Sequence, residues 1–169
     1  DGRALGLQGM INDLLERCDF PTVQPELNGQ VDELPARDPQ VVARLISLVE
    51  NHPEFGERVS TACDDLVRQR AVPVLGITGP GGSGKSSLVD ELVRRYLIDF
   101  DDKTIAVISV DPSKRKTGGA LLGDRIRMNA IDDPRVYMRS LATRQSNLAL
   151  SKHVQGAIDI CKAAGYDLV

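Results

Sequence analysis

Long apolar runs, paired cysteines and an excess of positive charge are all missing from this sequence. No apolar stretch approaches the roughly 20 residues that a helix needs to cross a bilayer. Lys and Arg total 21 against 24 Asp and Glu, giving a net charge of −3 and a pI near 5.4. This balance argues against a general nucleic-acid binder and against a protein held on acidic membranes. A composition of 41% hydrophobic and 27% charged residues instead favours a soluble globular protein.

Cysteine spacing excludes the common metal and redox motifs. Cys18, Cys63 and Cys161 are far apart and form no C-x-x-C pair. We therefore expect free thiols in a reduced, cytoplasmic setting. We expect His52 to lie at a helix end as a cap or surface residue, and His153 to be structural.

The sequence from Gly79 to Ser86, GPGGSGKS, matches the phosphate-loop pattern G-x-x-x-x-G-K-[ST]. Its glycines let the backbone curl so that successive N–H groups point at phosphate oxygens. Lys85 can reach the β- and γ-phosphates, and the Ser86 hydroxyl can ligate Mg²⁺. The predicted nucleotide-binding residues of the loop are Gly79, Gly81, Gly82, Ser83, Gly84, Lys85, Ser86 and Ser87.

The residues that flank the loop supply the strand and helix that the motif requires. Residues 74–78 predict a short buried strand, and residues 86–97 predict a helix with one apolar face. This order places the positive N-terminus of a helix under the phosphates. A glycine-rich turn that matches by chance would lack this context, so we favour a functional loop.

Upstream of the loop the sequence shows only helical periodicity. Residues 7–18 predict an amphipathic helix, and the proline-containing residues 20–36 predict a linker or extended loop. A second helix is expected from Asp38, its N-cap, to about residue 51, and a third at residues 54–70. We interpret their apolar stripes as packing surfaces.

Downstream of the loop, strands and helices alternate. Residues 104–110 predict a parallel strand covered on both faces, and residues 135–141 a weaker strand. A helix is expected at residues 147–164, followed by the start of another strand at residues 166–169. The predicted fold class is α/β, a P-loop NTPase whose parallel sheet is unfinished, preceded by an all-helical linker arm. We expect the chain to be a piece of a longer polypeptide.

A second group of candidate residues follows the strand at residues 104–110, which we expect beside the strand of the phosphate loop. Asp111 lies at its carboxyl end, where open α/β sheets bind ligands, although a simple Asp-Pro turn is the alternative. Asp124 could ligate Mg²⁺ or orient water, and Arg125 and Arg127 could neutralise charge on a transferring phosphoryl group. An ordinary Asp-to-Arg surface pair fits that spacing equally well.

Two weaker interpretations concern basic residues. Residues 114–119 predict a basic loop, for which a solvated charge run is the favoured interpretation. Arg139 and Arg144 are expected near the rim of the ligand crevice because they follow the third predicted strand.

Five segments follow one another in the chain: Gly79–Ser87, Ser109–Ser113, Gly118–Met128, Tyr137–Ser140 and Ala164–Asp167. Taken in this order, they resemble the MeaB/ArgK-type GTPases, the G-protein chaperones of adenosylcobalamin-dependent acyl-CoA mutases. The resemblance covers nearly the whole chain and is strongest to the branch fused inside a single-chain isobutyryl-CoA mutase. Gly81 and the pair Ala120-Leu121 depart from stand-alone members, which usually have Pro and often have Ser-Ile there.

The resemblance implies a set of site residues. Residues 81–87 would hold the GTP phosphates, and Arg127 would contact the nucleotide. Residues 114–127 would form a nucleotide-sensing switch. The implied Mg²⁺ ligands are Ser86, Asp111 and Asp124, and the implied catalytic residues are Lys85, Asp111, Asp124 and Arg127.

The resemblance also implies a domain organisation and partners. Residues 1–20 would be the C-terminal helix of a cobalamin-binding domain, residues 21–70 a helical linker, and residues 71–169 the N-terminal part of the GTPase domain. GTP hydrolysis would be coupled to loading and protection of adenosylcobalamin, which binds outside this segment. The expected partners are the cobalamin-binding and acyl-CoA mutase domains of the same polypeptide, without nucleic acid or membrane, in a homodimer of the full-length protein.

Two other functions stay open on the sequence. A P-loop small-molecule kinase would use ATP, with Asp111 as base and the basic loop as lid. A non-catalytic scaffold would bind a partner through residues 1–70. The guanine-reading segment and a later acidic residue near Mg²⁺ are expected beyond Val169, so base specificity depends on the resemblance, and we expect this fragment to hydrolyse GTP poorly or not at all.

Overall fold

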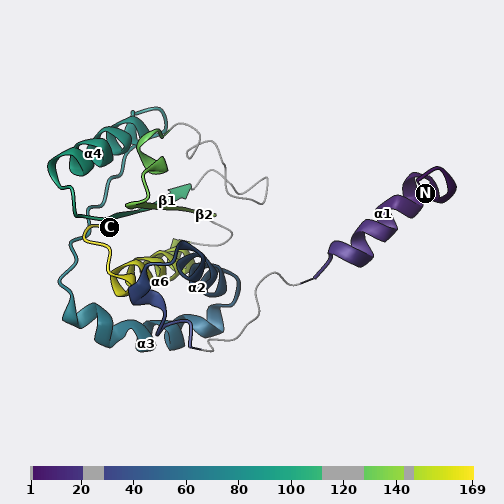
Figure 1. The fold of residues 1–169 in the computed structure, drawn as a ribbon, viewed down its shortest axis with the longest axis horizontal. Helices are drawn as coiled ribbons and strands as arrows, with labels where there is room; N and C mark the ends of the chain where they lie inside the picture. The colour runs from purple at the N-terminus through teal and green to yellow at the C-terminus, as the bar shows by residue number, and fades with distance from the viewer. Residues whose placement is uncertain (1, 21–28, 112–127, 143–146) are drawn as a thin grey trace.

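The computed structural model describes residues 2–20, 29–111, 128–142 and 147–169 (Figure 1). A sheet separates two layers of helix, and a further helix, α1, lies apart from them. The helices are α1 (Gly2–Cys18), α2 (Pro39–Asn51), α3 (Gly56–Gln69), α4 (Lys85–Asp99) and α6 (Asn147–Ala164); the strands are β1 (Ile105–Asp111) and β2 (Val136–Ala142); and the short 3-10 helices are η1 (Leu34–Ala36), η2 (Pro53–Phe55) and η3 (Ala130–Asp132).

The sheet is parallel, as predicted. β1 pairs with β2 over its whole length, from Ile105 opposite Val136 to Asp111 opposite Ala142. The last residues of the chain continue the sheet on the other side of β1, because Ala106 N donates to the Leu168 carbonyl at 2.9 Å. The predicted strands at residues 104–110 and 135–141 are therefore confirmed to within one residue.

The segment before the phosphate loop joins the sheet through the chain's last residues. Leu75 N donates to the Val169 carbonyl at 2.8 Å, and Val169 N donates to the Pro73 carbonyl at 3.1 Å. Within the described residues the predicted strand at 74–78 is limited to these contacts and is not a regular strand. The expected adjacency of the loop strand and β1 is wrong, because residues 167–169 lie between them. These last residues form an isolated bridge at Leu168 and not the regular strand predicted at residues 166–169.

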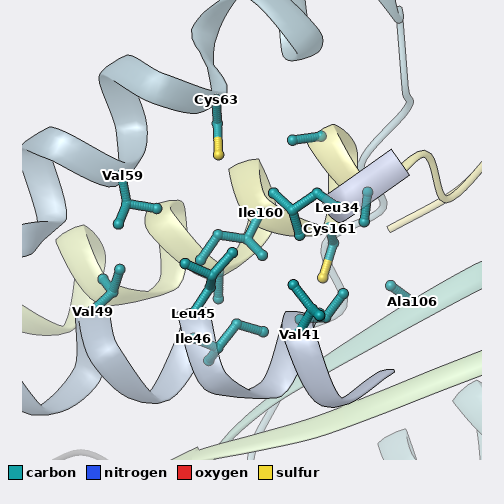
Figure 2. Packing of buried hydrophobic residues seen from close by; sticks show 14 of the residues in the cluster. Leu34, Val41, Leu45, Ile46, Val49, Val59, Cys63, Ala106, Ile160 and Cys161 are labelled. Carbon is teal, nitrogen blue, oxygen red and sulfur yellow. The ribbon is translucent and has the colours of Figure 1, made fainter. Parts of the chain in front are cut away.

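The two faces of β1 pack against different layers. Ala106 and Ile108 join the large core cluster that contains α2, α3 and α6, whereas Ile105 and Val107 pack with α4. This alternation is the period-two pattern of a strand buried on both faces, as the apolar run predicted. Figure 2 shows how side chains from these helices meet in the large cluster, with Leu45 near Ile160.

The helix boundaries follow local signals in the sequence. Asp38 caps α2, since its Oδ1 accepts a hydrogen bond from Gln40 N at 2.8 Å, and Pro39 occupies the first helical position. α6 ends where predicted, and Gly165 follows it with a φ of 86°. This φ lies in the left-handed region, which favours glycine just after a helix.

One core spans both parts of the chain. α2 and α3, which fall in the predicted linker at residues 21–70, are buried with α6 and the sheet through Leu45, Val59 and Cys63. α2 and α3 therefore pack in one core cluster with α6 and the sheet. Their apolar stripes are packing surfaces, as expected.

α1 differs from the other helices in its exposure. It ends at Cys18, as predicted, and breaks at Gly6, whose φ is 62°. Its apolar side chains are open to solvent, with Leu7 76% and Leu14 59% exposed. Among the described residues, no helix combines the length and apolarity needed to span a membrane.

Candidate nucleotide-binding site

The phosphate loop lies between the residues 73–75 at the sheet edge and the first turn of α4. Gly82 and Gly84 have φ values of 75° and 83°, in the left-handed region that glycine adopts without strain. Ser83 N donates to the Pro80 carbonyl at 3.3 Å and closes the turn. Gly84 occupies the N-cap position of α4, so the helix begins at Lys85, one residue earlier than predicted.

The side chain of Lys85 stabilises the shape of the phosphate loop through hydrogen bonds. Its Nζ donates to the carbonyl oxygens of Gly79, at 2.9 Å, and of Pro80, at 2.8 Å. These bonds turn the carbonyls of the first half of the loop toward the ammonium group. The curled shape expected from the glycines is thus held by the lysine of the same motif.

The first turn of α4 presents free backbone donors beside the loop. The first hydrogen bond at this end of α4 is from Leu88 N to the Gly84 carbonyl, at 2.9 Å. The N–H groups of Lys85, Ser86 and Ser87 precede it and therefore have no partner inside the helix. Donors in this position, together with the helix dipole, attract an anion such as a phosphate.

The predicted Mg²⁺ ligands are only partly within the described residues. Ser86 is half-buried in the first turn of α4, and Asp111 is the last residue of β1. Asp124 lies outside the described residues, as do Arg125, Arg127 and Arg144. A hydroxyl and carboxylates are the hard oxygen donors that suit Mg²⁺, so the residue types fit. Among the described side chains alone, no group of three or more His, Cys, Asp or Glu could hold a metal ion.

Arg139 lies away from the ligand crevice, and the expectation for it is wrong. Its Nη2 donates to Ser47 Oγ at 2.8 Å and to Glu50 Oε2 at 3.3 Å, both on α2. Arg139 sits in β2 three residues before the strand ends, on the face that also carries Tyr137 and Leu141. Alternation along the strand directs it to the α2 layer.

His52 lies at the end of a helix, as expected, whereas the structural role expected of His153 stays a prediction. His52 Nδ1 lies 3.3 Å from Glu54 Oε1 at the surface, just after α2. His153 lies within α6, half-buried.

Two aspartates have contacts that the sequence did not indicate. Asp90 of α4 binds the turn at Ala130, with 2.9 Å between Oδ1 and N. Asp167 accepts from Thr104 N at 2.9 Å and contacts Lys103 Nζ at 3.2 Å. Burial works against the charge of Asp167, but these hydrogen bonds and the ammonium outweigh it and lower its pKa. Asp167 therefore holds the last segment of the chain against the start of β1, and Asp90 holds the turn at Ala130 against α4.

The parallel sheet, the phosphate loop and the helix that begins at its lysine define an α/β domain of the P-loop NTPase class. The chain belongs to the family of the methylmalonyl-CoA mutase-associated GTPase MeaB, whose model matches residues 42–169. The match begins inside α2, in agreement with the single core that joins α2 to the sheet.

Relatives extend this assignment to the fused branch. The fused isobutyryl-CoA mutase of Geobacillus kaustophilus (strain HTA426) is 58% identical over 100% of this chain, which spans 16% of that protein. The fused isobutyryl-CoA mutase of Cupriavidus metallidurans is 52% identical over 100% of this chain and 15% of its own length. A putative GTPase of Pyrococcus horikoshii is 41% identical over 87% of this chain and 45% of its own length. The resemblance to MeaB-type GTPases is confirmed.

A solved structure shares the fold. The crystal structure of LAO/AO transport system kinase matches with a TM-score of 0.56 and 24% identity, over 89% of this chain and 43% of the other. The predicted fold class is confirmed by this likeness.

Proposed function

We propose that this chain binds Mg²⁺-GTP at the phosphate loop and belongs to the GTP-hydrolysing part of a fused acyl-CoA mutase. The observation that carries the proposal is the loop itself: Lys85 bonded to the Gly79 and Pro80 carbonyls, with Gly82 and Gly84 in the left-handed region beside the first turn of α4. Membership of the MeaB GTPase family and similarity to fused isobutyryl-CoA mutases support the choice of GTP.

The proposed roles follow from the chemistry of each side chain. Lys85 balances charge on the β- and γ-phosphates, and the N–H groups of the first turn of α4 bind their oxygens. Ser86, Asp111 and Asp124 hold Mg²⁺, which when bound neutralises charge on the phosphate oxygens. Arg127 contacts the nucleotide and stabilises negative charge as the phosphoryl group leaves. Catalysis is then mainly positioning and charge stabilisation.

The wider role is proposed from the relatives. We infer that GTP hydrolysis is coupled to loading and protection of adenosylcobalamin, bound on other domains of the same cytoplasmic, homodimeric polypeptide. Residues 1–20 would form the last helix of a cobalamin-binding domain, and residues 21–70 would connect it to the GTPase domain at residues 71–169. In this arrangement α2 and α3 make the connection while packed against α6.

Titration calorimetry on the complete protein tests the proposal. With Mg²⁺ present we expect GTP and GDP to bind, and ATP to bind far more weakly. Lys85→Ala should abolish GTP binding, because it removes both the phosphate contact and the bonds that hold the loop. Lys162→Ala is the matched control, since Lys162 lies on α6, across the sheet from α4.

Three outcomes would contradict the proposal. Absence of heat with guanine nucleotides would remove nucleotide binding altogether. A preference for ATP with phosphate passed to an acceptor would favour the kinase. Binding without hydrolysis in the complete protein would favour a non-catalytic scaffold.

A further inference from the structure

Asp90 of α4 holds the start of η3 from outside that helix. Its Oδ1 accepts a hydrogen bond from Ala130 N at 2.9 Å, and its Oδ2 lies 3.5 Å from Asn129 Nδ2. Asn129 is the N-cap residue of η3 but makes no capping bond with its own side chain. The carboxylate of Asp90 therefore takes the place of the missing cap, and a charged acceptor makes a stronger bond than a neutral one.

Apolar contacts hold the same turn against the same helix. Met128 and Ile131 are 5% and 8% exposed, in a cluster with Met138 of β2, and Val89 packs against this cluster. Val89 precedes Asp90 on α4. Val89 and Asp90 of α4 thus contact residues 128–131, one through an apolar contact and the other through a hydrogen bond.

The contacts of Val89 and Asp90 with residues 128–131 lie close to the phosphate loop, because both residues are on α4. α4 begins at Lys85, and a rise of 1.5 Å per residue places Asp90 roughly 8 Å along the helix axis from it. Arg127, the proposed nucleotide contact, is covalently attached to Met128. The point from which the chain continues toward Arg127 is therefore fixed relative to Lys85 and Ser86.

We propose that Asp90 is a positioning residue for GTP hydrolysis: by binding Ala130 N, it fixes the turn at residues 128–132 relative to the phosphate loop. This inference rests on the proposed function. Asp90 lies beyond the first turn of α4 and is not one of the proposed nucleotide contacts, so its loss should slow turnover more than it weakens nucleotide binding.

Steady-state GTP hydrolysis by variants of the complete protein tests this role. Asp90→Ala should lower kcat about tenfold while KM for GTP and the affinity for GDP stay within about twofold of wild type, because small misplacements of catalytic groups are costly. Asp90→Asn keeps an oxygen acceptor for Ala130 N and should restore most of kcat. Asp99→Asn, at an exposed position of the same helix, is the control.

Hydrogen exchange gives a second measurement, made first on the wild-type protein. In the wild-type protein, a non-hydrolysable GTP analogue should slow amide exchange at residues 128–132, and it should not do so in Asp90→Ala. If Asp90→Ala does not fold, the exchange of the wild-type protein and the kcat of Asp90→Asn test the role of Asp90 instead.

The outcomes separate the two proposals. A wild-type protein that binds no GTP removes both. A wild-type protein that binds and hydrolyses GTP, together with any of three results, overturns the role of Asp90 alone. Those results are an unchanged kcat in Asp90→Ala, an equal loss of affinity and turnover, or exchange at residues 128–132 that does not respond to nucleotide.

Discussion

Leu45→Ala tests whether α2 and the sheet unfold as one unit. Leu45 is 0% exposed and shares the large core cluster with Ile160 of α6 and Ala106 of β1 (Figure 2). The substitution removes three carbon atoms, about 2.4 kcal/mol of transfer free energy at ~0.8 kcal/mol each, and the cavity adds about 1 kcal/mol. We therefore expect a loss of roughly 3.5 kcal/mol in the free energy of unfolding of the whole core.

Native-state hydrogen exchange on the complete protein reads this loss region by region. Amides of α6 and β1 that open only with the whole core should lose the same free energy of opening as those of α2. Leu14→Ala is the matched control, because it removes the same atoms from α1, where Leu14 is 59% exposed. Its effect on α6 and β1 should stay within about 0.5 kcal/mol.

Exchange that changes in one region alone would refute the prediction that α2 and the sheet unfold together. Faster exchange confined to α2, with α6 and β1 unchanged, would mean that α2 is a separate unit resting on the sheet. The shared core cluster of α2, α6 and β1 would then not unfold as one unit, and a linker that folds on its own would replace it.

Three further predictions concern GTP binding by the phosphate loop, the reactivity of the cysteine thiols and unfolding at acid pH. Gly84→Ala should weaken GTP binding in calorimetry, because its φ of 83° costs an alanine about 1–2 kcal/mol although no atom lies within 4 Å of the new Cβ. Burial raises the pKa of Cys63 to about 11 and that of Cys161 to about 12, so mass spectrometry after alkylation at pH 8 should find label only on the exposed Cys18. The pKa of Asp167 is lowered from 3.8, so its carboxylate contributes stability above about pH 4 that disappears as pH falls through the folded value, and Asp167→Asn should flatten the acid-unfolding curve there.

Each of these has a simple control or contrary outcome. Gly76→Ala also meets no atom within 4 Å but has no positive φ, so it should leave affinity unchanged. Rapid labelling of Cys63 in the folded protein would show that the core opens readily. An Asp167→Asn variant with the wild-type acid transition would show that its contacts with Thr104 and Lys103 contribute no net stability.

The parts of the fold that depend on neighbouring residues in the chain were predictable from the sequence. Asp38 and Pro39 start α2, and glycines form the phosphate loop, because capping and backbone freedom are set within a few residues. The strand at residues 105–111 was equally clear, since burial on both faces demands an unbroken apolar run.

The parts that depend on contacts distant in sequence were not predictable in the same way. An apolar stripe shows that a helix is buried but does not name its partner, so the packing of α2 and α3 against α6 could not be predicted. The order of segments across the sheet was wrongly predicted for the same reason. The hydrogen bonds of Leu75 and Ala106 to residues 168–169 join segments that are far apart in the chain.

The role proposed for Asp90 shows why residues outside a motif are the hardest to find. Nothing in the residues around it separates it from Asp99, an exposed aspartate of the same helix. Only the fold brings Ala130 N to its carboxylate, across a sequence separation of 40 residues. Lys85 holds the start of α4 at the phosphate loop. A residue that contacts α4 a few positions later is therefore also held at a fixed position relative to the loop. A side chain needs no contact with the nucleotide to affect its hydrolysis, provided that it joins the phosphate loop to the chain that carries the other reacting groups.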